Sequence, residues 1–271
     1  MRISLLISTY ERPEALAAVL RSVGRQTFRP HQVVIGDDGS GPETKKVVDD
    51  AAARGLPIDH AWLAHDGFRL ARMRNHAAAR ATGDYLVIMD DDILLHPDFL
   101  ADHRDAARPG FFAQGSRALL DEAPSKMAQE RESYWPGLFT PGVGNRKNLI
   151  RSPFLSRLAG GEVKGMRGIR TCNFAVWRED YLRVNGFNED FVGWGREDSE
   201  FVTRLFNSGV KRRNVKYAAL GCHLYHPPRS REGLATNDGI LAASVDSGAT
   251  RCERGVNLHL EALAGPEGGA S

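Results

Sequence analysis

Two acidic clusters in this 271-residue chain have side chains of the types that group-transfer chemistry needs. The triplet Asp90-Asp91-Asp92 follows an apolar run that ends at Met89. The pair Glu197-Asp198 closes the segment Phe191-Val-Gly-Trp-Gly-Arg-Glu-Asp198, which precedes a helical pattern. The end of a strand and the start of a helix are rigid positions with one side open to solvent. Carboxylates there can hold a divalent cation or accept a proton, so the two clusters predict a metal-dependent transfer site.

Asp198 is the first candidate for proton transfer. In the predicted helix it shares a face with apolar side chains, those of Phe201, Val202 and Leu205. A carboxylate on an apolar face usually has a specific task. Stabilisation by the helix dipole is the alternative, and it explains Glu197 equally well.

The first half of the chain alternates between short apolar runs and helical periodicity. We expect strands at 3–7, 32–36, 58–63 and 85–89, and helices that start at Pro13 and span 43–53 and 69–81. This order is typical of an α/β fold with a mostly parallel sheet, in which ligands bind beyond the carboxyl ends of the strands. Three polar motifs fall at those ends and should converge on one crevice: Thr9-Tyr10, Asp37-Asp38 and Asp90–Asp92.

The second half is less regular. Residues 146–170 contain seven Arg or Lys against one acid, Glu162, which predicts a mobile basic loop. The last ten residues are rich in Gly, Ala and Pro, and we expect them to be disordered. We divide the chain into a first half at 1–108, a second half at 109–230 and a C-terminal extension at 231–271.

Composition limits the function classes. The formal net charge is only +2, so a general polyanion-binding surface is not expected, and nucleic acid is excluded as a partner. Cys172, Cys222 and Cys252 lack CxxC spacing, which argues against a disulfide framework and for a reducing compartment. The N-terminal apolar run is too short for a signal peptide, and no stretch approaches the roughly 20 apolar residues of a membrane span. These features predict a cytoplasmic protein.

Four motifs, in order, resemble those of a known family. The segments ending at Pro13, Ser40, Asn75 and Asp92 read Ile-Ser-Thr-Tyr-Glu-Arg-Pro, Gly-Asp-Asp-Gly-Ser, Arg-Asn and Met-Asp-Asp-Asp. They resemble the nucleotide-sugar half of inverting GT-A glycosyltransferases of family 2. The stretch from Cys172-Asn-Phe to Trp-Gly-Arg-Glu-Asp198 resembles the acceptor half of β-1,4-galactosyltransferases and bacterial chondroitin-type polymerases. The resemblance covers residues 2–228 and implies a single GT-A (Rossmann-like) domain, whose sheet is flanked by helices and whose C-terminal acceptor-binding part is irregular.

The acidic triplet matches the metal-binding DxD motif of that family. The resemblance implies Mn²⁺ or Mg²⁺, with Asp92 as direct ligand and Asp90 at the ribose, the metal or its water. Asp91 is an alternative for one of these roles. Carboxylate-bound cations suit a departing diphosphate because they neutralise its growing charge. Without the resemblance, a solvated acidic turn would explain the triplet.

Other residues are assigned to the nucleotide-sugar by the same resemblance. Asp38 matches the carboxylate that contacts uracil, and Thr9, Tyr10 and Arg12 would lie beside the base and ribose. An ordinary turn and helix cap is the alternative for Asp38. Three arginines are candidates for phosphate contact, with a solvated helix face as the alternative: Arg69, Arg72 and Arg74.

The acceptor half contributes the remaining roles. The resemblance implies Asp198 as general base and Glu197 as an acceptor-sugar contact. The Trp194 ring is expected to pack against an apolar face of a sugar, and a buried position in the core is the alternative. Arg196 occupies a position where the galactosyltransferases usually have a small residue, so the resemblance does not determine the identity of the acceptor.

A neutral imidazole is expected as the third metal ligand. His226 matches the position best, and His223 is the alternative. In an extended segment, residues three apart point to opposite faces, so we expect only one of them to reach the metal.

The resemblance implies an inverting hexosyltransferase that uses a nucleotide-sugar, expected to be a UDP-sugar, and a glycan or glycolipid acceptor. Bacterial lipopolysaccharide, O-antigen or capsule is the expected acceptor class, and the basic segment 146–170 suggests contact with anionic lipid at the inner membrane. Two rivals are a non-catalytic nucleotide- or glycan-binding protein and a sugar-1-phosphate nucleotidyltransferase. The latter would be expected to show a Gly-rich loop after the first strand, and none is present.

Overall fold

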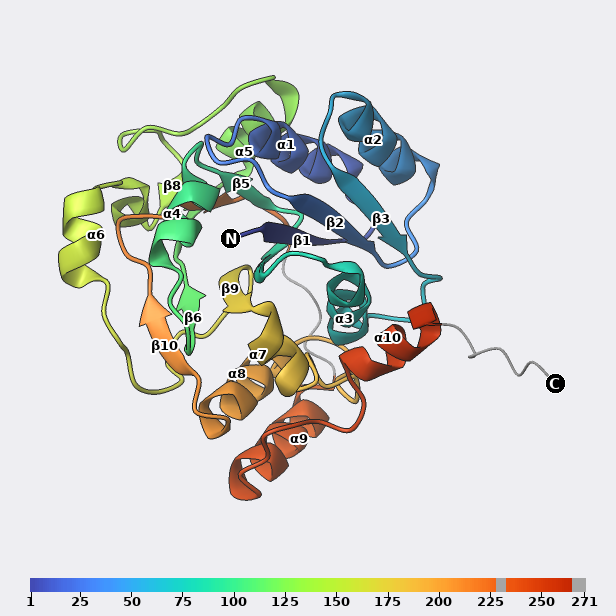
Figure 1. Cartoon of the computed structure of the whole chain (residues 1–271). Helices are drawn as coiled ribbons and strands as arrows, with labels where there is room; N and C mark the ends of the chain where they lie inside the picture. The colour runs from blue at the N-terminus through green and yellow to red at the C-terminus, as the bar shows by residue number, and fades with distance from the viewer. Residues whose placement is uncertain (228–232, 265–271) are drawn as a thin grey trace.

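A seven-stranded sheet forms the centre of the molecule in the computed structural model, which describes residues 1–227 and 233–264 (Figure 1). The strand order is β10-β6-β9-β4-β1-β2-β3. The strands are β1 (Ile3–Thr9), β2 (Gln32–Asp37), β3 (Ile58–Trp62), β4 (Tyr85–Asp90), β6 (Phe111–Gln114), β9 (Asn173–Trp177) and β10 (Lys211–Asn214). β9 is antiparallel to β4 and β6, and the other pairs in this sheet are parallel. The predicted α/β fold with a mostly parallel sheet is therefore confirmed.

Helices cover both faces of this sheet because its strands are apolar on both sides. Alternate residues of β1 belong to different core clusters: Ile7 packs with α1, and Leu6 packs on the opposite side with α3 and α8. The first face carries α1 (Pro13–Gly24), α2 (Pro42–Ala53) and α4 (Phe99–Ala106). The second carries α3 (Leu70–Arg80), α7 (Arg178–Arg183), α8 (Glu197–Asn207) and α10 (Val256–Ala264).

A second, four-stranded sheet was not predicted. Its order is β5-β11-β7-β8, with β5 (Ile93–Leu95), β7 (Arg117–Leu120), β8 (Val143–Gly144) and β11 (Gly221–His223). Strands of two to four residues leave too little alternation to recognise in a sequence. The sheet has a functional consequence, since β11 pairs His223 with Ile93, the residue after the acidic triplet.

The remaining helices correct two expectations. The basic segment contains a 3₁₀ turn η1 (Arg146–Leu149) and α6 (Pro153–Ala159), so describing all of it as a loop was wrong. Pro153 at the first helical position and Ser152, whose hydroxyl accepts the amide of Leu155, start α6. Of the ten C-terminal residues expected to be disordered, 262–264 end α10, and the others lie outside the described residues. The other helices are α5 (Glu122–Glu130) and α9 (Leu234–Asp246).

Among the described residues, no helix combines the length and the apolar character required to cross a bilayer.

Candidate active site

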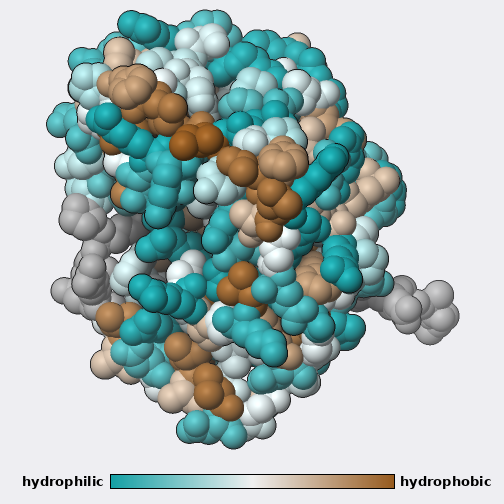
Figure 2. All heavy atoms as spheres, turned by 90° about the vertical axis from the view of Figure 1, so that its left-hand side faces the viewer, coloured by the Kyte–Doolittle hydropathy of each residue, from teal (hydrophilic) through white to brown (hydrophobic). Residues whose placement is uncertain are grey.

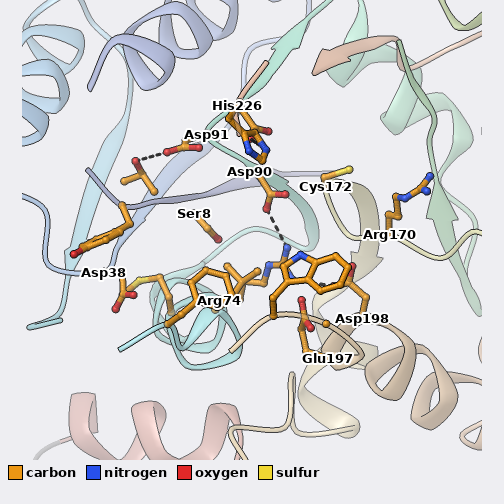
Figure 3. A pocket seen from close by; sticks show the side chains of 18 of the residues that line it. Ser8, Asp38, Arg74, Asp90, Asp91, Arg170, Cys172, Glu197, Asp198 and His226 are labelled. Atoms are coloured by element: carbon orange, nitrogen blue, oxygen red, sulfur yellow. Dashed lines mark hydrogen bonds and ion pairs between the residues drawn. The ribbon is translucent and has the colours of Figure 1, made fainter. Parts of the chain in front are cut away.

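A cavity of about 700 Å³ lies where the carboxyl ends of β1, β2 and β4 meet the start of α8 (Figure 3). It brings together Thr9, Tyr10, Arg12, Asp38, Arg74, Asp90, Asp91, Asp92, Trp194, Glu197, Asp198, His223 and His226. The predicted convergence of three strand ends is therefore found in the structure. The residues come from positions up to 217 apart in the chain, as the numbers of Thr9 and His226 show.

Arg74 joins the two acidic clusters. Its side chain is 2% exposed, and its two terminal nitrogens donate to Asp90 at 3.0 Å and to Asp198 at 2.9 Å. Both terminal nitrogens are therefore engaged by carboxylates. The structure places Arg74 as the link between the end of β4 and the start of α8, a different role from the expected phosphate contact.

Asp198 is held by a second residue that the sequence analysis missed. The amide of Thr171 donates to one carboxylate oxygen at 3.0 Å, and its hydroxyl donates to the other. Thr171 is buried, whereas 23% of the Asp198 side chain is exposed to the cavity. The carboxylate is thus fixed in direction yet reachable, as a general base has to be. In the sequence, the only sign of a role for Thr171 is its position directly before the Cys172-Asn-Phe motif.

Glu197 is a buried carboxyl group beside Asp198. It is 7% exposed, and its Oε2 has no hydrogen-bond partner among the described residues. Burial, and then the neighbouring charge of Asp198, raise the pKa of Glu197 to about 7. A buried oxygen without a partner in a cavity wall is available for a ligand hydroxyl.

The turn before α8 presents this pair to the cavity. Gly193, Gly195 and Arg196 have positive φ angles of 78°, 103° and 77°. Only glycine adopts the first two at little cost, which explains the Gly-Trp-Gly pattern. The turn leaves Trp194 at the cavity wall and 41% exposed, so the alternative of a buried core tryptophan is wrong.

Asp91 contacts the end of β1 and shares the Arg12 guanidinium with Asp92. It accepts the Thr9 hydroxyl at 2.7 Å and Arg12 at 3.2 Å. Burial, and then the charge of Asp92, raise the pKa of Asp91 to about 7. Asp91 therefore ties the end of β4 to the end of β1.

Asp92 lies beside both histidines. The Nε2 atoms of His223 and His226 are 3.6 and 3.4 Å from its carboxylate oxygens, and the three ligand atoms lie within 4.8 Å of one another. The expectation that only one histidine reaches this place was wrong, because β11 ends at His223 and the alternation of a strand does not continue to His226. Burial lowers the pKa of His223 to about 4, so the imidazole is neutral at pH 7, the form that binds metals.

A cation fits this group. The Oδ1 atom of Asp92 is buried without a hydrogen-bond partner in the described part of the chain, while Oδ2 accepts Arg12 at 2.7 Å. One carboxylate and two imidazoles suit Mn²⁺ or Zn²⁺ by donor type, and additional oxygen ligands from a diphosphate would favour Mn²⁺. Arg12, expected at the ribose, instead forms ion pairs with Asp91 at 3.2 Å and with Asp92 at 2.7 Å.

The end of β2 forms the other side of the cavity. Asp38 lies 3.3 Å from the Nδ1 of His65, whose ring stacks on Tyr10 with centroids 4.3 Å apart. Burial raises the pKa of Asp38. Arg69 does not line this cavity; it precedes α3, and its guanidinium binds Asp66 at 3.1 Å.

Comparisons with known proteins agree with this geometry. Residues 4–169 match the family described as glycosyl transferase family 2, and residues 161–227 match the N-terminal domain of galactosyltransferase. The chain is 29% identical over 283 residues to validoxylamine A glucosyltransferase of Streptomyces hygroscopicus subsp. limoneus, covering 95% of this chain and 56% of the relative. It is 26% identical over 261 residues to chondroitin synthase of Escherichia coli, covering 85% of this chain and 36% of the relative.

The chain therefore spans a little over half of the first relative and about a third of the second. A solved structure of S. aureus TarS 1-349 in complex with UDP-GlcNAc superposes with a TM-score of 0.64 at 15% identity, covering 90% of this chain and 66% of that one. At this identity the likeness shows a shared fold. These matches confirm the resemblance drawn from the motifs.

Proposed function

This chain belongs to glycosyltransferase family 2, and from that premise we propose that it is a metal-dependent inverting glycosyltransferase. The observation that carries the proposal is the bridge made by Arg74. It places a reachable carboxylate, Asp198, across the cavity from the group formed by Asp92, His223 and His226. A base and a leaving-group site on opposite sides of one cavity are what a single displacement requires.

In the proposed reaction the acceptor hydroxyl attacks the anomeric carbon of the donor. The new carbon–oxygen bond forms as the bond from that carbon to the diphosphate breaks, and the nucleoside diphosphate leaves with the bonding electrons. Asp198 takes the hydroxyl proton, and Arg74 and Thr171 keep its carboxylate aimed at the cavity. Glu197 contacts the acceptor sugar through its buried oxygen, and Trp194 covers one sugar face.

We also propose that the reaction uses a bound divalent cation. Asp92, His223 and His226 would hold it, with Asp90 beside them. When bound, Mn²⁺ or Mg²⁺ supplies positive charge that stabilises the departing diphosphate. Because Mg²⁺ is bound mainly through oxygen ligands, the two imidazoles make Mn²⁺ the better candidate of the two.

The proposed donor is a UDP-sugar that carries a hexose or N-acetylhexosamine. Asp38 would contact the uracil, while Thr9 and Tyr10 form the adjoining wall. The TarS structure in complex with UDP-GlcNAc supports this choice by its shared fold.

The proposed acceptor is a bacterial surface glycan, such as lipopolysaccharide, O-antigen or capsule. The relative named chondroitin synthase supports a glycan acceptor. We further propose a cytoplasmic protein that contacts the inner membrane through α6, whose Phe154 and Leu158 are 69% and 72% exposed. Figure 2 shows apolar groups among hydrophilic ones on the face that carries this helix. The surrounding segment 146–170, with its seven cations, suits anionic lipid headgroups.

The test of the catalytic proposal is release of nucleoside diphosphate from a panel of UDP-, GDP- and dTDP-sugars, with Mn²⁺ or with EDTA. We expect release from one UDP-sugar that stops in EDTA. Metal-independent release, or no metal-dependent binding of any donor, would contradict the proposal. For the membrane, liposome flotation of the variant Arg157→Ala, Arg167→Ala should decrease on anionic vesicles, and unchanged flotation would count against it.

A further inference from the structure

A second cavity, of about 400 Å³, lies next to the first and shares Arg117 and Arg170 with it. Its wall contains five cationic side chains, those of Arg117, Lys147, Arg170, Arg212 and Lys216. None of the described residues that line it is acidic. The basic cavity, as we call it, therefore concentrates positive charge in a protein whose formal net charge is only +2.

Arg212 shows that this charge is not neutralised by the protein. It is 4% exposed, and its guanidinium donates to Asn214 Oδ1 at 2.9 Å and to two backbone oxygens, those of Gly165 and Arg167, at 3.1 and 3.0 Å. None of the described carboxylates lies within ion-pair distance of it. The other deeply buried arginines differ, since Arg74 binds two carboxylates and Arg204 binds Glu200 at 2.7 Å.

Arg117 adds a second unsatisfied group. Its Nε is buried and has no hydrogen-bond partner among the residues that the structure describes. One of its terminal nitrogens donates to the sulfur of Cys172. A buried cation without an anion is unfavourable, so Arg212, with the buried unsatisfied Nε of Arg117 at the same cavity, points to a missing anionic ligand.

The cavity is also built on rigid elements. Gln114 ends β6 and Asn214 ends β10, and these two strands pair in the central sheet. Asn148 lies in the 3₁₀ turn η1 and donates to the backbone oxygen of Arg117 at 2.7 Å. The cations therefore surround a preformed hollow, which distinguishes them from lysines scattered on a surface.

The position of the basic cavity indicates what binds there. Asp38 and Arg170 lie on opposite sides of the crevice, with Asp90, Arg74 and Asp198 between them (Figure 3). If the nucleotide occupies the side of Asp38, as the proposed function holds, the basic cavity lies beyond the base, on the acceptor side.

We infer that the acceptor carries an anionic group, a phosphate, carboxylate or sulfate, that binds in the basic cavity next to the sugar that is glycosylated. This inference rests on the proposed function for its assignment to the acceptor. Planar guanidinium groups bind such oxyanions through paired hydrogen bonds, and the lysines add charge at the rim. Acceptors without an anion near the reacting sugar bind weakly.

The experiment uses titration calorimetry on the full chain saturated with UDP and Mn²⁺, so that the donor site is filled. The probes are glucose 6-phosphate, glucuronic acid and neutral glucose at constant ionic strength. The variant is Lys147→Ala, Lys216→Ala, whose side chains lie in the exposed rim. The matched control is Lys45→Ala, Lys46→Ala, two exposed lysines on α2.

We expect at least one anionic probe to bind the wild type at least tenfold more tightly than glucose. The rim variant should lose most of that preference, and the control should keep it. Equal binding of charged and neutral probes, or an unchanged rim variant, would overturn the inference. Inorganic phosphate that binds as tightly as glucose 6-phosphate would also overturn it. The same holds if phosphatidylglycerol vesicles bind through Lys147 and Lys216 while neither sugar anion binds.

Failure of the proposed function would look different. It would appear as absent UDP binding in the first titration, before any acceptor probe is added. Binding of the sugar anions is read in a later titration, so the two failures are distinguishable.

Discussion

Replacement of Glu197 by Gln should stabilise the fold at alkaline pH. Burial raises the pKa of Glu197 from 4.5 to about 7, so the folded protein favours the neutral acid. Below pH 4.5 the group is protonated in both states and its ionisation has no effect on folding. As the pH rises through 7, ionisation is more favourable in the unfolded chain, and the stability from the neutral form is lost.

The magnitude follows from the size of the shift. A rise of the Glu197 pKa from 4.5 to about 7 corresponds to roughly 3 kcal/mol of unfolding free energy between pH 4 and pH 8.5. The side chain is 7% exposed, so solvent screening reduces this figure little. Asp198 contributes part of the shift, and Asp198→Asn should therefore reduce the pH dependence without removing it.

The assay is urea unfolding at pH 4.0 to 8.5 of wild type and Glu197→Gln. The difference in unfolding free energy between the two proteins should grow with pH in favour of the variant. Glu130→Gln, at an exposed site on α5, is the control and should follow the wild type. Parallel curves for wild type and Glu197→Gln would refute the reasoning, because they would show that Glu197 is ionised in the fold at little cost.

Three further predictions concern the groups around the cavity. Arg74→Met leaves Asp90 and Asp198 without their cation and should cost about 3 kcal/mol in urea unfolding, the lower end for a buried pair, since the two carboxylate side chains are 31% and 23% exposed. A cost below about 1 kcal/mol would contradict the bridge. Thr171→Val removes one hydrogen bond to Asp198 but keeps the shape, so turnover should fall about tenfold with donor affinity unchanged in calorimetry; equal turnover would show that this hydroxyl does not position the base. His223→Ala and His226→Ala should each weaken Mn²⁺ binding in calorimetry by at least tenfold, and a full effect from only one of them would assign the metal to that imidazole.

Three strands of the first half, β1, β2 and β4, were predictable because each is a short apolar run that stops at a polar motif. β1 and β4 are mostly apolar because both of their faces are buried, and they end at Thr9 and Asp90. In a parallel sheet these ends share one edge, so their convergence followed from the pattern alone.

The links between distant segments could not be predicted from local patterns. Arg74 and Asp198 are 124 residues apart, and the sequence gives no sign that one arginine binds both acidic clusters. Likewise, β11 is a three-residue strand whose pairing with β5 decides where His223 lies. Such contacts depend on tertiary packing rather than on periodicity.

The basic segment shows a different limit. Its charge was visible, but α6 was missed because it is seven residues long and buries no side chain, so it lacks the apolar stripe that identifies a helix. The second cavity could not be predicted for a different reason. Its cations come from separate elements, β7, η1, β10 and the loops beside them.

The most direct test of the account compares wild type with Asp198→Asn, using the donor that the panel identifies. Asp190→Asn, an exposed acid paired with Arg254, is the matched control. We predict that Asp198→Asn binds the UDP-sugar with Mn²⁺ as the wild type does but loses at least a thousandfold in transfer rate, while Asp190→Asn keeps full activity. Transfer within tenfold of the wild-type rate in Asp198→Asn would show that this carboxylate is not the base and would contradict the mechanism.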